Sequence, residues 1–222
     1  MLDMSRMVST RKQYEEIILE LIPLFDAMYH FPYFEKRYPS KLPTPTRINC
    51  GDCFVMALLV HEIAKSRGLN PTLCAGGWHV WVMEAGFIFD SYFPGGITKQ
   101  GVAKLRVNVQ TQDDDPNEPV FYQGSKAKEG DYSFLNGYFE NSPSRGYFVY
   151  GVLSLYGLKV PVGLNKFVYR RKLPNFIYTR DISKAWVTKR RRLQSTQHAM
   201  KRFVAKLRNQ HEETRLRLCQ PG

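Results

Sequence analysis

A short stretch of this sequence carries residue types suited to nucleophilic catalysis. Residues 49–57 read NCGDCFVMA and place Cys50 and Cys53 just before an apolar run. His79 follows in WHVWVM and Asp90 in FIFDSYF, two alternating, aromatic-rich runs typical of strands. A thiol, an imidazole that takes its proton and a carboxylate that orients the imidazole form a catalytic triad. We therefore expect Cys53 as nucleophile, His79 as base and Asp90 as orienting acid.

The run after Cys53 predicts a buried helix that begins at the cysteine. Every residue from 54 to 59 is apolar, and Gly68 stands where a C-terminal cap belongs. A thiol at a helix N-terminus experiences the positive end of the helix dipole and nearby backbone N–H groups, which favour the thiolate and can hold an oxyanion. Asp52 repels a thiolate, so we expect Cys53 to need a cationic partner, and His79 is the candidate.

The separation of His79 and Asp90 predicts that a β-hairpin brings them together. The shortest hairpin closes at Ala85-Gly86 and pairs Trp81 with Asp90. In this register His79 and Asp90 are diagonal neighbours on one face, about 7–8 Å apart at the backbone, so their side chains can meet. A three-residue loop would shift the register by one residue and place them on opposite faces.

Taken together, these motifs resemble the transglutaminase-like superfamily. GDCFVMA is similar to its cysteine signature, WHVWV to its histidine strand and FIFDSYFP to its aspartate strand, over roughly residues 45–95. The resemblance implies a papain-like α+β core and a thioester intermediate. It also implies that Cys53 is the nucleophile, because Ala57 follows it at the signature spacing. Papain-like enzymes often use an upstream glutamine as oxyanion donor; here Asn49 or a distant aromatic residue would have to serve, together with the backbone N–H of Cys53.

Other uses of the same cysteines remain open. Cys50 and Cys53 have the spacing of a redox pair, although a thioredoxin-like motif follows a buried strand and LPTPTRIN does not read as one. With Cys74 and His79 they have the ligand chemistry of a zinc site, although a second closely spaced pair is lacking. The acidic loop DDDPNEPVFYQG lacks the glycine and glutamate of a calcium loop. We expect no metal, no cofactor and no structural disulfide.

The elements that must position these residues fit one domain with an appended tail. A chain of 222 residues, 43% of them hydrophobic, is long enough for one full core. We expect residues 1–179 to form an α+β domain, with an N-terminal helix over 10–30 that Pro23 kinks or breaks and a core over 45–178. The proline-rich segment between them predicts an extended connector. Residues 180–222 predict a basic helical tail.

Positive charge is concentrated in that tail. Residues 180–222 contain 12 lysines and arginines and three acids, a net charge of +9, whereas the rest of the chain carries only +3. The run MKRFVAKLRNQ predicts a helix that docks through its apolar residues and turns Lys201, Arg202, Lys206 and Arg208 outward. Such a surface suits phosphates, so we expect non-specific nucleic-acid binding through 187–217. No signal-peptide pattern or membrane-spanning run is visible, which predicts a cytoplasmic protein.

The sequence therefore predicts a cysteine hydrolase, a peptidase or amidase, that acts on a protein or peptide through a thioester. An amine in place of water would make it an acyltransferase. The competing hypothesis is a protein that keeps the fold as a scaffold with an idle triad and serves as a nucleic-acid-associated or assembly component.

Overall fold

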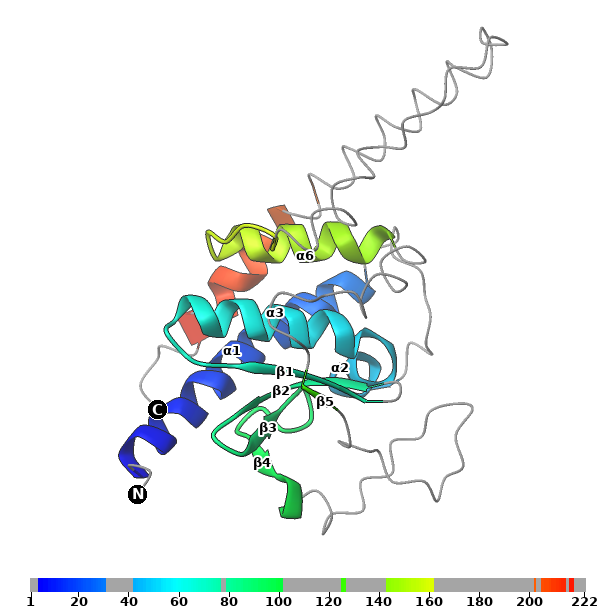
Figure 1. Ribbon diagram of the computed structural model, residues 1–222. Helices are drawn as coiled ribbons and strands as arrows, with labels where there is room; N and C mark the ends of the chain where they lie inside the picture. The colour runs from blue at the N-terminus through cyan, green and yellow to red at the C-terminus, as the bar shows by residue number, and fades with distance from the viewer. Residues whose placement is uncertain are drawn as a thin grey trace, which may run out of the picture.

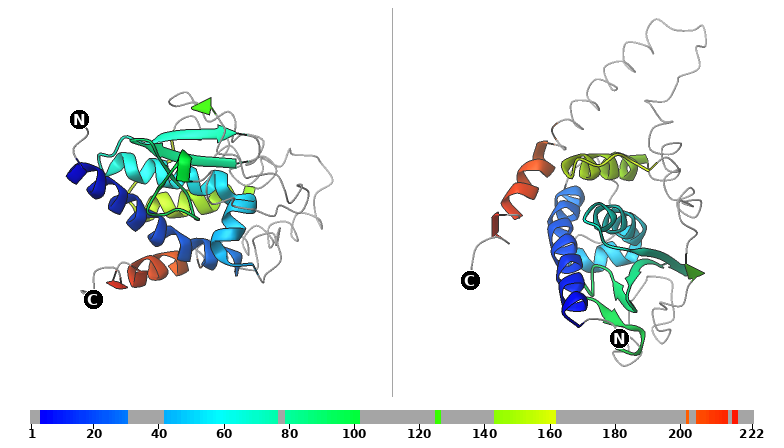
Figure 2. Two further views of the ribbon diagram at one scale, coloured as in Figure 1. Left: turned by 90° about the horizontal axis from the view of Figure 1, so that it is seen from below. Right: turned by 60° about the vertical axis from the view of Figure 1, so that its left-hand side comes forward.

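The computed structural model describes residues 4–30, 42–76, 79–101, 125–126, 143–161, 202, 205–214 and 216–217. Over these residues the fold is α+β, with helices packed on one face of an antiparallel sheet (Figure 1). Helix α3 (Cys53–Ser66) lies between the sheet and α6 (Pro143–Leu155). Helix α1 (Met4–Tyr29) runs alongside α3, as the two further views also show (Figure 2). The α+β class expected from the sequence is confirmed.

Helix α1 is longer than its sequence signals indicate. It begins at Met4 rather than at Thr10, and Pro23 lies inside it without ending it. Proline removes one backbone hydrogen bond, but fully buried side chains on both sides of Pro23 hold the helix against the core: Leu21, Leu24 and Phe25. Near its start, Arg11 Nε donates to the carbonyl of Gly95 at 2.8 Å and ties the helix to the sheet end.

The end of the expected connector is helical, which corrects the prediction of an extended segment up to residue 48. Helix α2 (Thr44–Arg47) follows Pro43 and has Pro45 in its first turn. Proline is tolerated there because the first N–H groups of a helix have no intrahelical acceptor. A π-helical turn, η1 (Ile48–Asp52), continues from α2 and leads directly into α3. The connector's residues 31–41 lie outside the described part of the chain.

Helix α3 is the central element, as its all-round apolar character predicts. Ten of its residues are buried, and it ends in a Schellman motif around Gly68, whose φ is +79°. The Leu69 N–H donates to the carbonyl of Ala64 at 3.0 Å, and the Gly68 N–H donates to the carbonyl of Lys65 at 3.0 Å. Both ends of the predicted helix are therefore confirmed.

The sheet has five strands in the order β4-β3-β2-β1-β5, all antiparallel to their neighbours. Strand β2 is central, so its two faces pack against different partners. Val80 and Val82 point into the main core with α3, whereas Trp81 belongs to a second cluster with Cys74 and Ile88. The bounds of the strands are Thr72–Gly76 (β1), His79–Glu84 (β2), Phe87–Phe89 (β3), Ile97–Thr98 (β4) and Ser125–Lys126 (β5).

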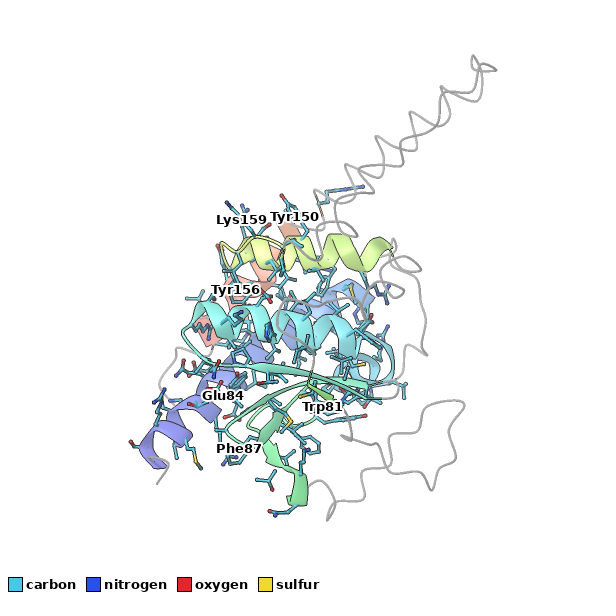
Figure 3. All side chains as sticks on the ribbon, in the orientation of Figure 1. Trp81, Glu84, Phe87, Tyr150, Tyr156 and Lys159 are labelled. Carbon is cyan, nitrogen blue, oxygen red and sulfur yellow. The ribbon has the colours of Figure 1, made fainter. Side chains whose placement is uncertain are left out.

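The hairpin between β2 and β3 has the predicted two-residue loop. Glu84 pairs with Phe87, and both central residues of the turn, Ala85 and Gly86, have positive φ, at 49° and 83°. Two positive φ values identify a type I′ turn, whose twist matches that of the strands. Glu84 and Phe87 are labelled at this end of the hairpin in Figure 3. Glu84 also accepts a 2.7 Å hydrogen bond from Tyr14 of α1.

Two further elements complete the described core. Helix α6 was not predicted, because the run YFVYGVLSL is rich in aromatic and β-branched residues that favour strands. Residues 205–214 are helical and dock on the body through Leu207, which is fully buried in the main core. Arg202, Lys206 and Arg208 are exposed, as expected for this run; Lys201 and residues 162–200 lie outside the described part. In that part no helix has the length and apolar character needed to cross a bilayer.

Candidate active site

Cys53 is the first residue of α3 and is 2% exposed. The π-turn η1 leads directly into the helix, and its last residue, Asp52, departs from helical geometry at φ −114° and ψ 15°. The separate helix N-terminus expected at Cys53, with its unpaired N–H groups, is therefore replaced by a continuous helical segment that begins at Thr44. Irregular π turns of this kind are frequent at functional sites because they re-aim one side chain within a helix.

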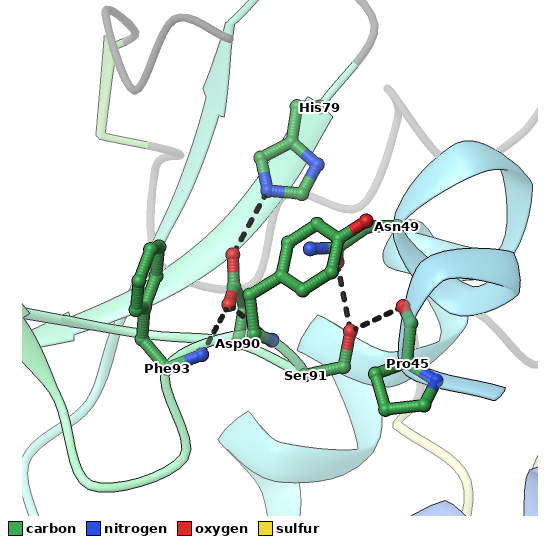
Figure 4. A network of polar contacts seen from close by, with 7 residues as sticks. Pro45, Asn49, His79, Asp90, Ser91 and Phe93 are labelled. Atoms are coloured by element: carbon green, nitrogen blue, oxygen red, sulfur yellow. Dashed lines mark hydrogen bonds and ion pairs between the residues drawn. The ribbon is translucent and has the colours of Figure 1, made fainter. Parts of the chain in front are cut away.

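His79 lies at the start of β2 and is brought to Cys53 and Asp90 as the sequence predicts. Its Nε2 lies 3.3 Å from Asp90 Oδ2, and both side chains are buried (Figure 4). A further hydrogen bond joins the imidazole to Cys53. Because Asp90 occupies Nε2, Nδ1 is the ring nitrogen left for the thiol. The three predicted site residues thus meet at the junction of α3, β2 and the end of β3.

The two partners of His79 control its charge. Burial lowers the pKa of the imidazole, but hydrogen bonds to Asp90 and Cys53 and the Coulombic attraction of both groups raise the pKa of His79 to about 10. The ring therefore carries a proton at neutral pH in the resting site. Trp81, two residues along the same strand, stacks near the imidazole at 5.8 Å between ring centroids and limits its rotation.

Asp90 is held by the backbone of its own turn. Strand β3 ends at Phe89, earlier than the run FIFDSYF predicts, because Asp90 Oδ1 accepts hydrogen bonds from the N–H groups of Tyr92 at 2.8 Å and Phe93 at 3.0 Å. Its other oxygen, Oδ2, is directed to His79 (Figure 4). The carboxylate therefore both caps the turn and orients the imidazole, with one oxygen for each task.

Ser91 links this turn to the helical segment that carries the nucleophile. Its hydroxyl lies 2.9 Å from the carbonyl of Pro45 in α2 and 2.9 Å from Asn49 Oδ1 in η1 (Figure 4). The Asn49 side chain is buried, and its Nδ2 has no hydrogen-bond partner among the described residues. The role expected for Asn49 from the sequence, an oxyanion donor four residues before Cys53, stays a prediction.

Asp52, the residue before the nucleophile, is neutralised by a group that sequence reasoning missed. Arg145 of α6 forms a two-point ion pair with it, Nε to Oδ1 at 3.0 Å and Nη2 to Oδ2 at 3.2 Å, and Tyr29 donates to Oδ2 at 2.9 Å. The expectation that His79 alone must offset Asp52 is therefore incomplete. A lone arginine at the start of an apolar run is the signal that marked Arg145 in the sequence.

The positions of the cysteines bear on the alternative redox and metal-binding roles. Cys53 and Cys74 carry reduced thiols, and Cys74 lies on β1 opposite Trp81, in the cluster on the second face of the sheet. The described residues contain no group of three or more histidine, cysteine or acidic side chains arranged to hold a metal. The side chain of Cys50 and the acidic loop around residues 111–123 lie outside the described part of the chain.

In comparisons with family models, with curated proteins and with solved structures, the chain matches none of them.

Proposed function

We propose that this protein is a cysteine-dependent acyl-transfer enzyme of transglutaminase-like, papain-like type that hydrolyses an amide or ester bond in a protein or peptide. One observation carries the proposal: a buried thiol, an imidazole and a carboxylate from three separate elements join in a hydrogen-bonded row. A buried carboxylate bonded to backbone N–H groups and to one imidazole nitrogen fixes the ring with its other nitrogen at the thiol. This arrangement suits thioester chemistry.

The charge state of His79 defines the first half of the reaction. Because its pKa is about 10, the imidazole holds a proton at neutral pH and offers a counter-charge to the Cys53 thiolate. The sulfur attacks the carbonyl carbon of the substrate and forms a carbon–sulfur bond as the carbonyl electrons move to oxygen. His79 then donates its proton to the leaving amine or alkoxide, and the collapse of the tetrahedral species yields the thioester.

The second half of the reaction depends on interactions of His79 with Cys53 that are lost when the thioester forms. Two of the effects that raise the pKa of His79 come from Cys53, its hydrogen bond and its charge. Acylation neutralises the sulfur and cancels both, so the pKa of His79 falls and the imidazole becomes a base for the attacking water. Asp90 keeps its position throughout because the Tyr92 and Phe93 N–H groups hold its other oxygen. Water releases the acid and regenerates the thiolate with the imidazolium.

One side chain is suited to stabilise the oxyanion. The Asn49 amide nitrogen is buried on the turn before Cys53 and has no hydrogen-bond partner among the described residues. The Cys53 N–H, the other donor expected from the sequence, follows a π-helical turn whose i→i+5 pattern directs it to a backbone carbonyl. We therefore assign Asn49 as the donor, in the place of the upstream glutamine of papain-like enzymes. Hydrolysis is favoured over transfer because water requires no acceptor site.

Intact-mass analysis with an activated acetyl ester tests this function. The wild-type protein should acquire one acetyl group at Cys53, and the adduct should decay at neutral pH with release of acetate. Cys53→Ser should give no such decaying adduct, and Cys74→Ser should behave like the wild type because Cys74 packs in a separate cluster with Trp81 and Ile88. Acetylation spread equally over the cysteines would refute the proposal. Addition of a primary amine distinguishes transfer from hydrolysis by the mass of the product.

A second candidate is the scaffold role, with nucleic acid as the partner. It is favoured by the helix at 205–214, where buried Leu207 docks on the body while Lys206 and Arg208 are exposed. A docked basic helix presents a fixed array of cations to a phosphate backbone. Nucleic-acid binding by this helix is compatible with either candidate, and the acetylation experiment decides whether the triad is idle.

A further inference from the structure

The ion pair between Asp52 and Arg145 is the most deeply buried pair of charges next to the site. Their side chains are 0% and 1% exposed, and the guanidinium contacts both carboxylate oxygens. Removing two charges from water carries a desolvation penalty that the attraction of the pair often fails to exceed, so such pairs are weak evidence for a purely stabilising role. A role beyond stability is therefore the better explanation for this pair.

Its position points to the nucleophile. Asp52 is joined directly to Cys53, and consecutive Cα atoms lie only about 3.8 Å apart. It is also the last residue of η1, directly before α3, and has a non-helical conformation, with φ −114° and ψ 15°. Without a partner, its carboxylate would be a buried negative charge beside the sulfur and would oppose formation of the thiolate. The orientation of Asp52 and its charge therefore both act on Cys53.

The other charged groups around Cys53 come from several elements. His79 of β2 bonds to the thiol, and Asp90, directly after β3, lies behind His79. On the helical side, Tyr29 of α1 donates to Asp52, and the Arg47 guanidinium of α2 lies 3.9 Å above the centre of the Tyr29 ring. Each carboxylate thus has a cationic partner, which is the imidazolium of His79 for Asp90 and the guanidinium of Arg145 for Asp52.

We propose that Arg145 is a positioning residue for the nucleophile: its two-point ion pair holds Asp52 at the break between η1 and α3 and cancels the charge beside Cys53. This inference rests on the proposed function, since it assigns a further residue to the same site. It makes α6, about ninety residues from Cys53 in the sequence, part of the machinery that activates the thiol.

Two single substitutions, one that removes the positive charge and one that removes the negative charge, distinguish this role from simple packing. Arg145→Met leaves the Asp52 carboxylate beside the thiol, so the pH midpoint of Cys53 alkylation by iodoacetamide should rise by about one unit or more. Asp52→Asn leaves the guanidinium, so the midpoint should fall. The double variant Asp52→Asn with Arg145→Met removes both charges and should return the midpoint to the wild-type value, as buried pairs replaced together are well tolerated.

Arg145→Lys is the conservative control, because it keeps the charge and loses the two-point contact. Its midpoint should stay at the wild-type value while the alkylation rate falls several-fold, which also keeps the proposal testable if a single neutral change prevents folding. Shifts of both single variants in the same direction, or a displaced midpoint in Arg145→Lys, would overturn it. If wild-type Cys53 shows no enhanced reactivity, the proposed function fails; if it does and these variants leave the midpoint unchanged, only the role of Arg145 fails.

Discussion

Among the residues that the structure describes, two buried acid–histidine pairs can be compared, and one of the two lies beside a thiol. In the pair at the candidate site, His79 Nε2 lies 3.3 Å from Asp90; in the other, His211 Nε2 lies 3.7 Å from Glu20. The four side chains are similarly buried, at 10% and 4% exposure in the first pair and 9% and 10% in the second. Residue types and burial therefore do not separate them.

The other contacts of the two acid–histidine pairs distinguish one pair from the other. Glu20 of α1 also accepts from Arg67 at 3.1 Å and from Tyr156 at 2.7 Å, and the Tyr156 ring packs edge-on against His211. Tyr156, labelled in Figure 3, is the residue directly after α6. This cluster joins α1, the end of α3, the turn after α6 and the helix at 205–214. Asp90 instead bonds to backbone N–H groups and one imidazole, which in turn bonds to Cys53. The first pair orients a nucleophile, and the second holds helices together.

The largest effect is expected when His79, the base of the first pair, is replaced. His79→Gln should lower the rate of thioester formation about a thousandfold, because it removes the imidazolium that supports the thiolate and protonates the leaving group. His211→Gln is the matched control and should leave this rate unchanged. Single-turnover acetylation followed by mass spectrometry measures both. A comparable loss in the two variants would show that the pairs are not functionally different.

A smaller effect is expected when Asp90, the acid of the first pair, is replaced. Asp90→Asn keeps an oxygen for the Tyr92 and Phe93 N–H groups but removes the charge that supports the imidazolium. We expect kcat to fall on the order of a hundredfold with little change in KM, because the orientation of the base matters only in the transition state. Steady-state kinetics with the activated ester checks this. An equal rise in KM would indicate a binding role for Asp90.

The second pair should affect stability rather than chemistry. Glu20→Gln weakens the contacts of a buried carboxylate with Arg67 and His211, so the free energy of unfolding should fall by about 2 kcal/mol. Urea denaturation measures the loss, and Cys53 alkylation should remain at the wild-type rate. Reduced alkylation in a folded Glu20→Gln protein would connect the helix-docking cluster to the site.

The two pairs should also respond to pH in opposite directions. Burial raises the pKa of Glu20, but its bonds to His211 and Tyr156 and the charge of Arg67 outweigh burial and bring it below its ordinary value of 4.5. Its stabilising contribution is therefore present above about pH 4.5 and is lost as the pH falls further. The pKa of His79 is raised to about 10, so its contribution is present below about pH 6.5 and is lost as the pH rises towards 10. Unfolding curves of Glu20→Gln and His79→Gln across pH should each lack one of these two losses.

The smallest effect concerns the exposed cations of the docked helix. Replacing Arg202, Lys206 and Arg208 by glutamine should reduce the slope of log affinity against log salt for duplex DNA by about 2.7, if each contacts one phosphate. Neutralising Arg6, Lys12 and Lys65, exposed on α1 and α3, is the matched control. Substitution is preferable to deletion because Leu207 is part of the core. An unchanged slope would leave these cations as a solvated helix face.

Local signals explain what the sequence could predict. The start of α3, its Gly68 cap and the Ala85-Gly86 turn depend on neighbouring residues, and the turn fixes the register that brings His79 to Asp90. Asp90 ended its strand early because its own carboxylate competes for the backbone N–H groups that follow, which a strand pattern does not reveal.

Non-local contacts explain what the sequence could not predict. Arg145 lies 93 residues from Asp52, in a helix whose residues favour strands, so neither the helix nor its partner could be inferred from local preference. The π-turn before Cys53 could not be predicted, because the prolines that precede it are typical of loops. Helix α2 nevertheless accommodates proline in its first turn. Tertiary packing overrode propensity at both places.

The central claim is that His79 and Asp90 activate Cys53, and the rate of alkylation at each cysteine tests it most directly. In the folded wild-type protein at neutral pH, iodoacetamide should modify Cys53 much faster than Cys50 or Cys74, as resolved by peptide mass spectrometry, and His79→Ala should remove this difference. Equal modification of Cys50, Cys53 and Cys74, unaffected by the change at His79, would contradict the claim.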